Sequence, residues 1–355
     1  MAQHPKQIPV ELIFNPNWWN RHYGISFSMP FYFDKKTRIQ NNLVMRHVLY
    51  DRFGIGEFIP RPFPVIGSLH VAGGFVLPAL YGVEIRFSEN EAPIPLPLNL
   101  SREKIFELKA PDLEATWPMD VLIADMDSLE EEFGFVVGDF GTDGILNTGL
   151  QLRGQQLFTD FNEDPDLVHH LFSILTETTL ALASYLKHRT GTCAIATNRS
   201  ILNVEPQMYL LSDGSVQMVS PSIYEKYLLA YELRLAEHLQ PYGIQYSGDN
   251  LQRYSTVNSK VPVIFFDVDW GSDVARCRQA FPKAFLNLRL SPVDMLQKKP
   301  DEIREITTRL LTAGYFPGKI GICCINMDYG TPDENVVAIM EAVKKYSLSR
   351  TIHVT

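Results

Sequence analysis

YLLSDGSVQMVSPSIYEKYLLAYELRLAEHLQPYGIQYSGDN, residues 209–250, shows one pattern twice: an apolar run that ends in an acid. Each run is typical of a buried strand, and the turns that follow contain Asp213 and Asp249. Between the runs, Ser220 and Pro221 mark the start of a helix, which a proline and a glycine end. A strand, a helix and a strand of these lengths predict a parallel βαβ unit.

The same alternation continues to both sides of this unit. Right-handed crossovers place successive strand ends on one side of a parallel sheet, and α/β proteins bind ligands on that side. Asp213 and Asp249 are therefore expected to share one face. The sequence predicts an α/β fold, a (β/α)8 TIM barrel, as a single domain over residues 1–355. Its later strands are predicted at CAIAT (193–197), MYLL (208–211), GIQYS (243–247), VIFFDV (263–268), AFLNL (284–288) and GICCINM (321–327).

Composition and charge narrow the class of protein. The 32 basic and 41 acidic residues give a net charge of −9, which argues against a nucleic-acid partner because phosphate binding needs a basic surface. No apolar run approaches the roughly 18 residues that span a bilayer, and the N-terminal MAQHPKQIPVEL lacks the apolar core of a signal peptide. The four cysteines form no C-x-x-C spacing. A cytoplasmic protein with reduced thiols and no membrane partner is expected, and a homodimer is left open.

Residues 1–110 are expected to form an N-terminal extension and lid of the barrel. FNPNWWNRHYGISFSMPFYF, residues 14–33, is rich in aromatic side chains. Such a segment either plugs the bottom of a barrel or lines a pocket for a flat ligand, in which case Trp18, Trp19 and Tyr23 would bind substrate. The Pro- and Gly-rich residues 60–100 follow, and His70 among them is either a structural histidine or a substrate contact.

Acids recur where the predicted strands end. Any one of them could cap a helix, but several on one face indicate a site. Arg289 is the cation among them, and pairing within the protein is the favoured expectation over an anionic ligand. The acids are Asp139, Asp213, Asp249, Asp267 or Asp269, and Asp328. Between the first two, GILNTGLQLRGQQLFTDF (144–161) is an amphipathic segment leading into a helix.

Several segments, in order and spacing, resemble the uroporphyrinogen decarboxylase superfamily. NLRLSPVDML followed by GICCINMDYGTPDENVVAIMEAVKKY is similar to its last two barrel units, with TPDEN as the best marker. SDGSVQMVSPSIYEKYLLAYELRLAEHL followed by GIQYSGDN resembles its middle, and PALYGVEIRF its early lid segment. The resemblance covers about residues 16–347 and implies a barrel enzyme.

Departures from the pattern decide between the two branches that the resemblance implies. In the decarboxylases an aspartate five residues ahead of a lid proline holds the tetrapyrrole; here Gly73 precedes Pro78 at that spacing. NPNWWNRHYG also replaces the arginine-rich N-terminal motif. NPNWW, YGVEI and SDGSVQMVSP are closer to methyltransferases that exchange a methyl group with a cobalamin-carrying protein, particularly those acting on methoxylated aromatic compounds.

Zinc, which many members of that branch bind, is not expected here. Their His-x-Cys-Gly motif falls on GIQYSGDN, where Gln245 and Ser247 occupy the ligand positions. Cys323 and Cys324 lie near a third position, but cysteines in an apolar strand are usually just buried. We therefore expect no bound metal, with the oxygens of Glu225 and Asp249 as the remaining candidates for a different site.

The resemblance and the residues together predict a corrinoid-dependent methyltransferase that takes a methyl group from a small methoxylated, aromatic or methylated molecule. The corrinoid (cobalamin) would be carried by a separate protein, because the barrel accounts for the whole chain. The alternatives are a cofactor-free decarboxylase of a small acid, with Arg289 binding the carboxylate, and a non-catalytic scaffold that binds a corrinoid protein. The oxygen that leaves a methyl ether is a poor leaving group, so an acid has to protonate it. The expected catalytic residues are Asp213, Tyr246, Asp249 and Glu205, and the expected substrate contacts are Trp18, Trp19, Tyr23, His70, Asp267, Arg289 and Asp328.

Overall fold

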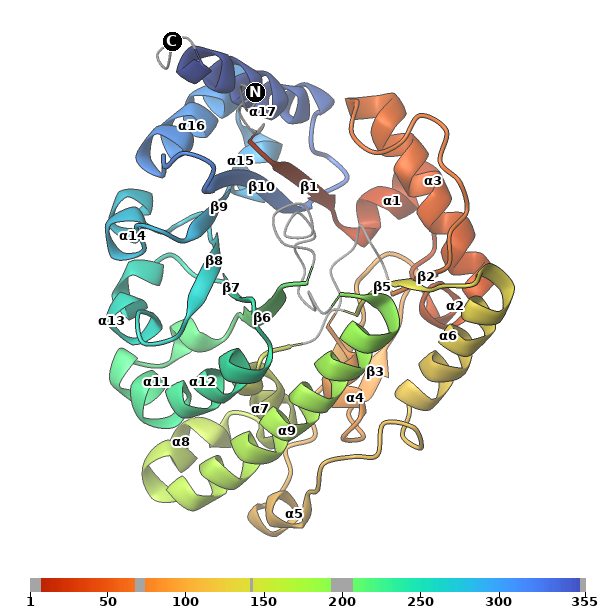
Figure 1. Ribbon diagram of the computed structural model, residues 1–355, viewed down its shortest axis with the longest axis vertical. Helices are drawn as coiled ribbons and strands as arrows, with labels where there is room; N and C mark the ends of the chain where they lie inside the picture. Colours follow the sequence, from red (N-terminus) through yellow and green to blue (C-terminus); the bar gives the residue numbers. More distant parts are fainter. Residues whose placement is uncertain (1–7, 68–73, 141–142, 193–206, 352–355) are drawn as a thin grey trace.

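A curved parallel sheet forms one half of the molecule (Figure 1). The computed structural model describes residues 8–67, 74–140, 143–192 and 207–351. The sheet has six strands in the order β1-β10-β9-β8-β7-β6, and every neighbouring pair is parallel. These strands are β1 (Val10–Phe14), β6 (Tyr209–Asp213), β7 (Tyr242–Tyr246), β8 (Val263–Val268), β9 (Phe285–Arg289) and β10 (Ile320–Met327).

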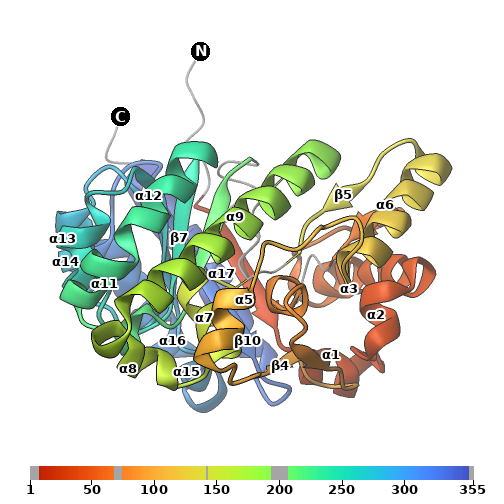
Figure 2. The ribbon, with the colours of Figure 1, turned by 90° about the horizontal axis from the view of Figure 1, so that it is seen from below.

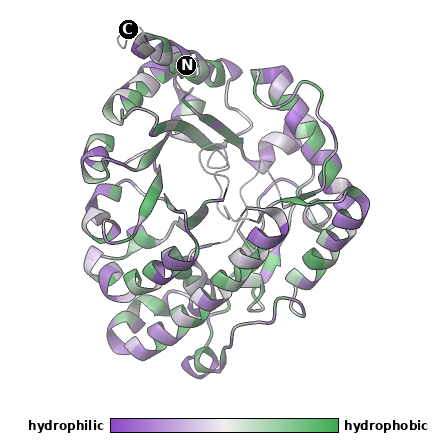
Figure 3. Cartoon of the chain, viewed as in Figure 1, coloured by the Kyte–Doolittle hydropathy of each residue, from purple (hydrophilic) through white to green (hydrophobic). Residues whose placement is uncertain are grey.

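The strands are buried on both faces, as parallel strands covered by helices must be. All five residues of β7 and all five of β9 are buried, and Figure 3 shows apolar colour concentrated along the strands. The helices between and after these strands cover the outside of the sheet (Figure 1). They are α11 (Pro221–Tyr227), α12 (Leu229–His238), α13 (Ser255–Asn258), α14 (Val274–Ala280), α15 (Pro292–Gln297), α16 (Pro300–Ala313) and α17 (Asp333–Thr351), with 3₁₀ turns η1 (Val216–Met218) and η2 (Leu251–Tyr254).

The other half contains shorter strands and most of the N-terminal helices. β2 (Val65–Ile66) pairs in parallel with β5 (Val137–Gly138), and β3 (Glu84–Arg86) pairs antiparallel with β4 (Ile94–Leu96). The expected ring of eight paired strands is therefore confirmed only as a half-barrel within the described residues. The helices here are α1 (Pro16–Tyr23), α2 (Met29–Phe33), α3 (Lys35–Phe53), α4 (Val76–Ala79), α5 (Arg102–Glu107), α6 (Met119–Phe133), α7 (Ile145–Arg153), α8 (Gln156–Glu163) and α9 (Pro165–Thr190).

The βαβ unit predicted from residues 209–250 is confirmed. β6 and β7 are adjacent and parallel, with Asp213 opposite Tyr246 in the register. The connecting helix differs from the single one expected, since it is divided at Leu228 into α11 and α12. Leu228, with φ of −109°, forms a turn between the two helices. The hydroxyl of Ser220 accepts a hydrogen bond from the Ile223 amide, so the predicted N-cap is also present.

The N-terminal segment takes part in the sheet. Residues 1–110, expected as extension and lid, include β1, which pairs with β10. Figure 2 shows α1 and α15, which follow β1 and β9, on the same side of the sheet. That side is the rim where the strands end. None of the described helices combines the length and apolarity needed to cross a membrane.

Candidate active site

The predicted rim of strand ends is present, and it brings several expected residues together. Asp267 in β8 lies between Gln245 of β7 and Asn287 of β9 in the register. Arg289, the last residue of β9, lies opposite Cys323 of β10. The strand register thus places an acid, a cation and a thiol on neighbouring strands near one end of the sheet.

Arg289 is enclosed by two carboxylates. Its Nη2 donates to Asp267 at 2.8 Å and its Nη1 donates to Asp269 at 3.0 Å, while only 4% of its side chain is exposed. Burial alone would lower the pKa of Arg289, but the two carboxylates outweigh it and raise that pKa. The pairing expected within the protein is therefore the arrangement found, and Arg289 stays charged.

Asp269 also holds the loops of the rim together. Its carboxylate accepts hydrogen bonds from the Gly248 amide after β7, at 2.8 Å, and from the Trp270 amide, at 2.9 Å. The Ser272 hydroxyl donates to the Gly248 carbonyl at 3.2 Å. Together with the Arg289 contact, these bonds connect the ends of β7, β8 and β9. Asp267 and Asp269 both act through bonds inside the protein.

Tyr246 and Asp249, expected as catalytic neighbours, differ in their environments. Tyr246 is fully buried, and its hydroxyl donates to the side chain of Asn250. Asp249 is exposed and packs beside Gly271, where an added Cβ would lie 2.3 Å from the Asp249 Cβ. Asp213 ends β6 next to them. The other expected acid, Glu205, and the lid residues His70 and Gly73 lie outside the described residues.

The expected aromatic contacts pack mainly on one another. Trp18 and Trp19 are fully buried, with Trp18 stacked on Phe14 at 4.1 Å between ring centroids. Tyr23 keeps 38% of its surface exposed, and its hydroxyl accepts a hydrogen bond from Arg52 at 3.3 Å. The indole rings of Trp18 and Trp19 are therefore covered by protein. Of these three aromatic residues, Tyr23 is the one with substantial exposed area.

Asp328 and the β10 end contact the same N-terminal helix. The Asp328 carboxylate accepts from the Tyr329 amide at 2.5 Å, and that amide also reaches the Asn17 side chain at 3.2 Å. The imidazole of His22 contacts the Tyr329 carbonyl at 3.0 Å. Asp328 is partly exposed, so it remains accessible at the rim beside α1.

The positions that would hold zinc do not fit that metal. Gln245 is buried and Ser247 is partly exposed, and neither side chain is an ordinary zinc ligand. Burial, and next the charge of Asp267, raise the pKa of Cys323 well above its ordinary value, and burial raises the pKa of Cys324 to about 12. Such thiols resist the ionisation that metal binding needs.

A different metal site elsewhere finds no support in the part of the chain that the structure describes. That part contains no group of three or more His, Cys, Asp or Glu side chains placed to hold a metal ion. Glu225, a candidate for an oxygen-rich site, is exposed and forms an ion pair with Lys260.

A residue that the sequence did not single out lies in the loop between β5 and α7. Asp143 accepts a hydrogen bond from Gln151 Nε2 at 2.7 Å and a long one from Asn147 Nδ2 at 3.5 Å. Burial raises the pKa of Asp143 more than these hydrogen bonds lower it. The four-residue spacing of the three polar positions within an amphipathic segment was the signal that could have indicated it.

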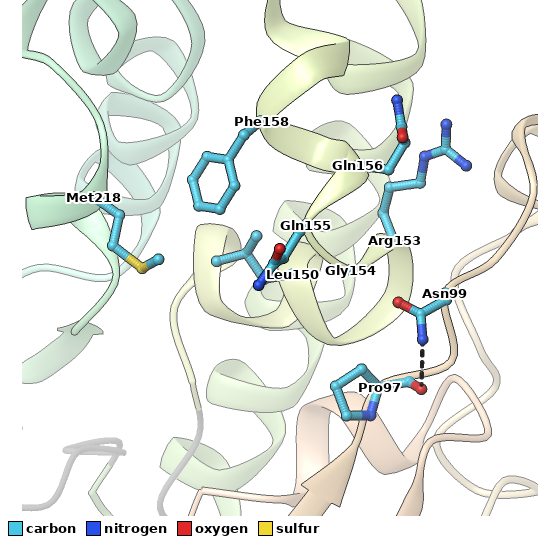
Figure 4. A pocket seen from close by; sticks show the side chains of 9 residues that line it. All are labelled: Pro97, Asn99, Leu150, Arg153, Gly154, Gln155, Gln156, Phe158 and Met218. Atoms are coloured by element: carbon cyan, nitrogen blue, oxygen red, sulfur yellow. Dashed lines mark hydrogen bonds between the residues drawn. The ribbon is translucent and has the colours of Figure 1, made fainter.

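Two of the cavities among the described residues are lined by none of the expected site residues. One, of about 740 Å³, opens between α7, α8 and η1, where Met218 and Phe158 face each other (Figure 4). Its lining is Pro97, Asn99, Leu150, Arg153, Gly154, Gln155, Gln156, Phe158 and Met218. The other, of about 810 Å³, lies between α16 and α17 and is mostly polar in its lining residues.

The curved parallel sheet, with its polar residues at the strand ends, defines an α/β barrel-like protein. The model of the family described as uroporphyrinogen decarboxylase (URO-D) matches residues 72–346, and the chain belongs to this family. A solved structure of a methyltransferase from Methanosarcina mazei has a similar fold, with a TM-score of 0.67. It is 15% identical, and the match covers 97% of this chain and 96% of that one. No curated protein sequence gives a significant match.

Proposed function

We propose that this protein is a corrinoid-dependent methyltransferase. It would move a methyl group from a small methoxylated or methylated donor, aromatic ones included, to a corrinoid bound by a separate protein. The family model is described as a decarboxylase, whereas the similar solved structure is named a methyltransferase. At 15% identity that likeness concerns the fold, so the choice between the two activities rests on the residues.

The observation that carries the choice is the enclosed Arg289. A decarboxylase of a small acid would need this guanidinium to bind the substrate carboxylate. Both terminal nitrogens of Arg289 already donate to carboxylates of the protein, and 4% of the side chain is exposed. Releasing it for a substrate would leave Asp267 and Asp269 without their counter-charge, which is costly in a buried site.

Methyl transfer needs a donor pocket and an acid rather than a free cation. The corrinoid, as the second substrate, supplies the nucleophilic cobalt that accepts the methyl group. The protein has to orient the donor, exclude water and protonate the departing oxygen, because alkoxides and phenoxides are poor leaving groups. The expected acids Asp213, Asp249 and Glu205 are our candidates for this proton donor, with Asp328 and Tyr23 as candidate donor contacts.

The test is methyl transfer to free cob(I)alamin, followed by its visible absorption, from a panel of methoxybenzoates and methylated amines. A donor-dependent spectral change is expected, and Asp213→Asn should reduce its rate. Release of carbon dioxide from an acid with no spectral change for any donor would overturn the proposal in favour of a decarboxylase. Metal analysis of the purified protein provides a second test. Tightly bound stoichiometric zinc would contradict the proposal that methyl transfer proceeds here without zinc.

A further inference from the structure

Asp143, just before α7, and Asn147 and Gln151 within α7 form a polar stripe. They recur four residues apart, so they share one side of the segment. All three are partly exposed, whereas Ile145, Leu146 and Leu152 of the same segment are buried. The stripe therefore keeps part of its surface exposed, while the apolar side of the helix packs into the core.

Among the described residues, the side chains that hydrogen-bond to the Asp143 carboxyl are neutral. Its hydrogen bonds come from the amides of Gln151 and Asn147, and within the described residues no basic side chain pairs with it. Asp213 ends the neighbouring strand β6. A carboxyl with neutral donors, partly removed from water, keeps its proton to a higher pH than an ordinary aspartate. It can then give that proton away at a pH where exposed carboxyls have none.

The backbone fixes Asp143 at the end of β6. The neighbouring Gly144 approaches so closely that an added Cβ would lie 2.3 Å from the Ser212 carbonyl oxygen. The Asn147 side chain accepts a hydrogen bond from the Ser215 amide, at 2.8 Å, just after β6. The main chain of Gln151 is held in turn, because its main-chain carbonyl accepts a hydrogen bond from the Leu98 amide at 2.8 Å. Asp143 thus belongs to the same rim as the strand ends already described.

We propose that Asp143 is the proton donor of methyl transfer and that Asn147 and Gln151 position its carboxyl. This inference rests on the proposed function. In the step, the bond between the methyl carbon and oxygen breaks and the oxygen keeps the electron pair. The oxygen takes the proton of Asp143, which becomes a carboxylate, and the cobalt of the carrier supplies the electron pair of the new bond to carbon.

This role also selects the class of donor. A methyl ether leaves a basic oxygen, which gains from protonation as the bond breaks. A quaternary ammonium donor leaves a neutral amine and needs no proton, and a neutral carboxyl would offer its positive charge little attraction. The polar stripe therefore indicates methyl ethers rather than quaternary ammonium compounds.

The experiment compares two ethers that differ in the basicity of the departing oxygen. The wild-type protein, Asp143→Asn and Asp143→Glu are assayed with free cob(I)alamin and either 4-methoxybenzoate or 4-methoxy-3-nitrobenzoate. Asp143→Asn should slow transfer about 10²- to 10⁴-fold with the first and much less with the nitro compound, whose phenoxide leaves without help. Asp143→Glu should restore part of the rate. The exposed Asp166→Asn is the matched control and should leave both rates unchanged.

The wild-type rate should fall as the pH rises through the pKa of Asp143, and the Asp143→Asn rate should not show this fall. Equal losses with both ethers and an unchanged pH profile would overturn the role as proton donor. Transfer from tetramethylammonium but from no ether would overturn the donor class while leaving the proposed function intact.

A direct measurement separates this inference from the proposed function. The infrared difference spectrum between wild-type and Asp143→Asn should contain the C=O stretch of a protonated carboxyl at pH values where an ordinary aspartate, with a pKa of about 3.9, is ionised. Absence of that band would overturn the inference even in an active protein. If no donor reacts, the proposed function fails, while the band still decides whether Asp143 stores a proton.

Discussion

Two acidic regions of the same rim differ in the groups that bond to their carboxyls. At the ends of β8 and β9, Asp267 and Asp269 are held by the guanidinium of Arg289 and by backbone amides. Beside the end of β6, the Asp143 carboxyl accepts hydrogen bonds, among the described residues, from the amides of two neutral side chains. A cation keeps carboxylates ionised and fixed, whereas neutral donors with partial burial let a carboxyl keep its proton. The first region is suited to hold the rim together and the second to transfer a proton.

The largest expected effect comes from removing the cation of the first region. Arg289→Met would leave the buried Asp267 and the partly buried Asp269 without a counter-charge and should lower the free energy of unfolding by about 3–5 kcal/mol. Urea unfolding followed by circular dichroism measures it. Arg289→Lys, which keeps the charge but loses the planar fork, is the control and should lose less. A loss below about 1 kcal/mol in the methionine variant would show that the two regions are not energetically different.

A smaller effect is expected where the second region contacts the sheet. Gly144→Ala would place a methyl group 2.3 Å from the Ser212 carbonyl oxygen, so α7 has to move away from β6. The expected cost is about 1–3 kcal/mol of stability, together with slower methyl transfer as Asp143 shifts. Gly214→Ala is the control, because the atom nearest to its added methyl would be the Asn147 amide nitrogen, at 3.3 Å. Equal costs for both variants would contradict the importance of the Gly144 contact.

A still smaller difference between the two regions is expected in how the free energy of unfolding depends on pH. The pKa of Asp143 is raised in the folded state above its unfolded value, so the contribution of this group is complete below the unfolded pKa and is lost as the pH rises through the folded one. Asp143→Asn removes this loss. Its stability relative to wild type should therefore increase from about pH 4 toward neutrality, as measured by urea unfolding at several pH values, while Asp166→Asn should show no such trend.

The smallest change in stability is expected at the exposed edge of the first region. Trp270 follows Asp269 directly and has 54% of its surface exposed. Trp270→Ala should alter the free energy of unfolding by less than about 0.5 kcal/mol. If the carrier protein docks on this rim, the variant should transfer methyl groups normally to free cob(I)alamin but more slowly to the corrinoid protein. Equal rates with both acceptors would exclude Trp270 from the docking surface.

Local patterns in the sequence predicted the parts of the fold that depend on nearby residues. The β6 and β7 strands and the Ser220 cap follow from apolar runs and cap chemistry. Residues 144–161, expected as an amphipathic segment leading into a helix, form most of the two helices α7 and α8.

The candidate site was harder to predict because its chemistry depends on tertiary contacts. The partners of Arg289 follow from the register of β8, β9 and β10, which periodicity does not specify. The environment of Asp143 depends on the approach of Gly144 to β6 and on amides one and two turns along α7. Asp213 and Asp249 were visible as strand-end acids, but burial and neighbours, which set a pKa, are not written in a strand pattern.

The pairing of β1 with β10 has a consequence for how the chain acquires its structure during synthesis. Val10 lies opposite Ile322, so the first strand gains its neighbour only after almost all of the other elements have been made (Figure 1). Contacts so distant along the chain slow folding, since a long loop must close before they are gained. Until then the edge of β1 and the indoles of Trp18 and Trp19 lack their final cover, and nascent chains would be most prone to aggregate, and most in need of a chaperone, at this N-terminal segment.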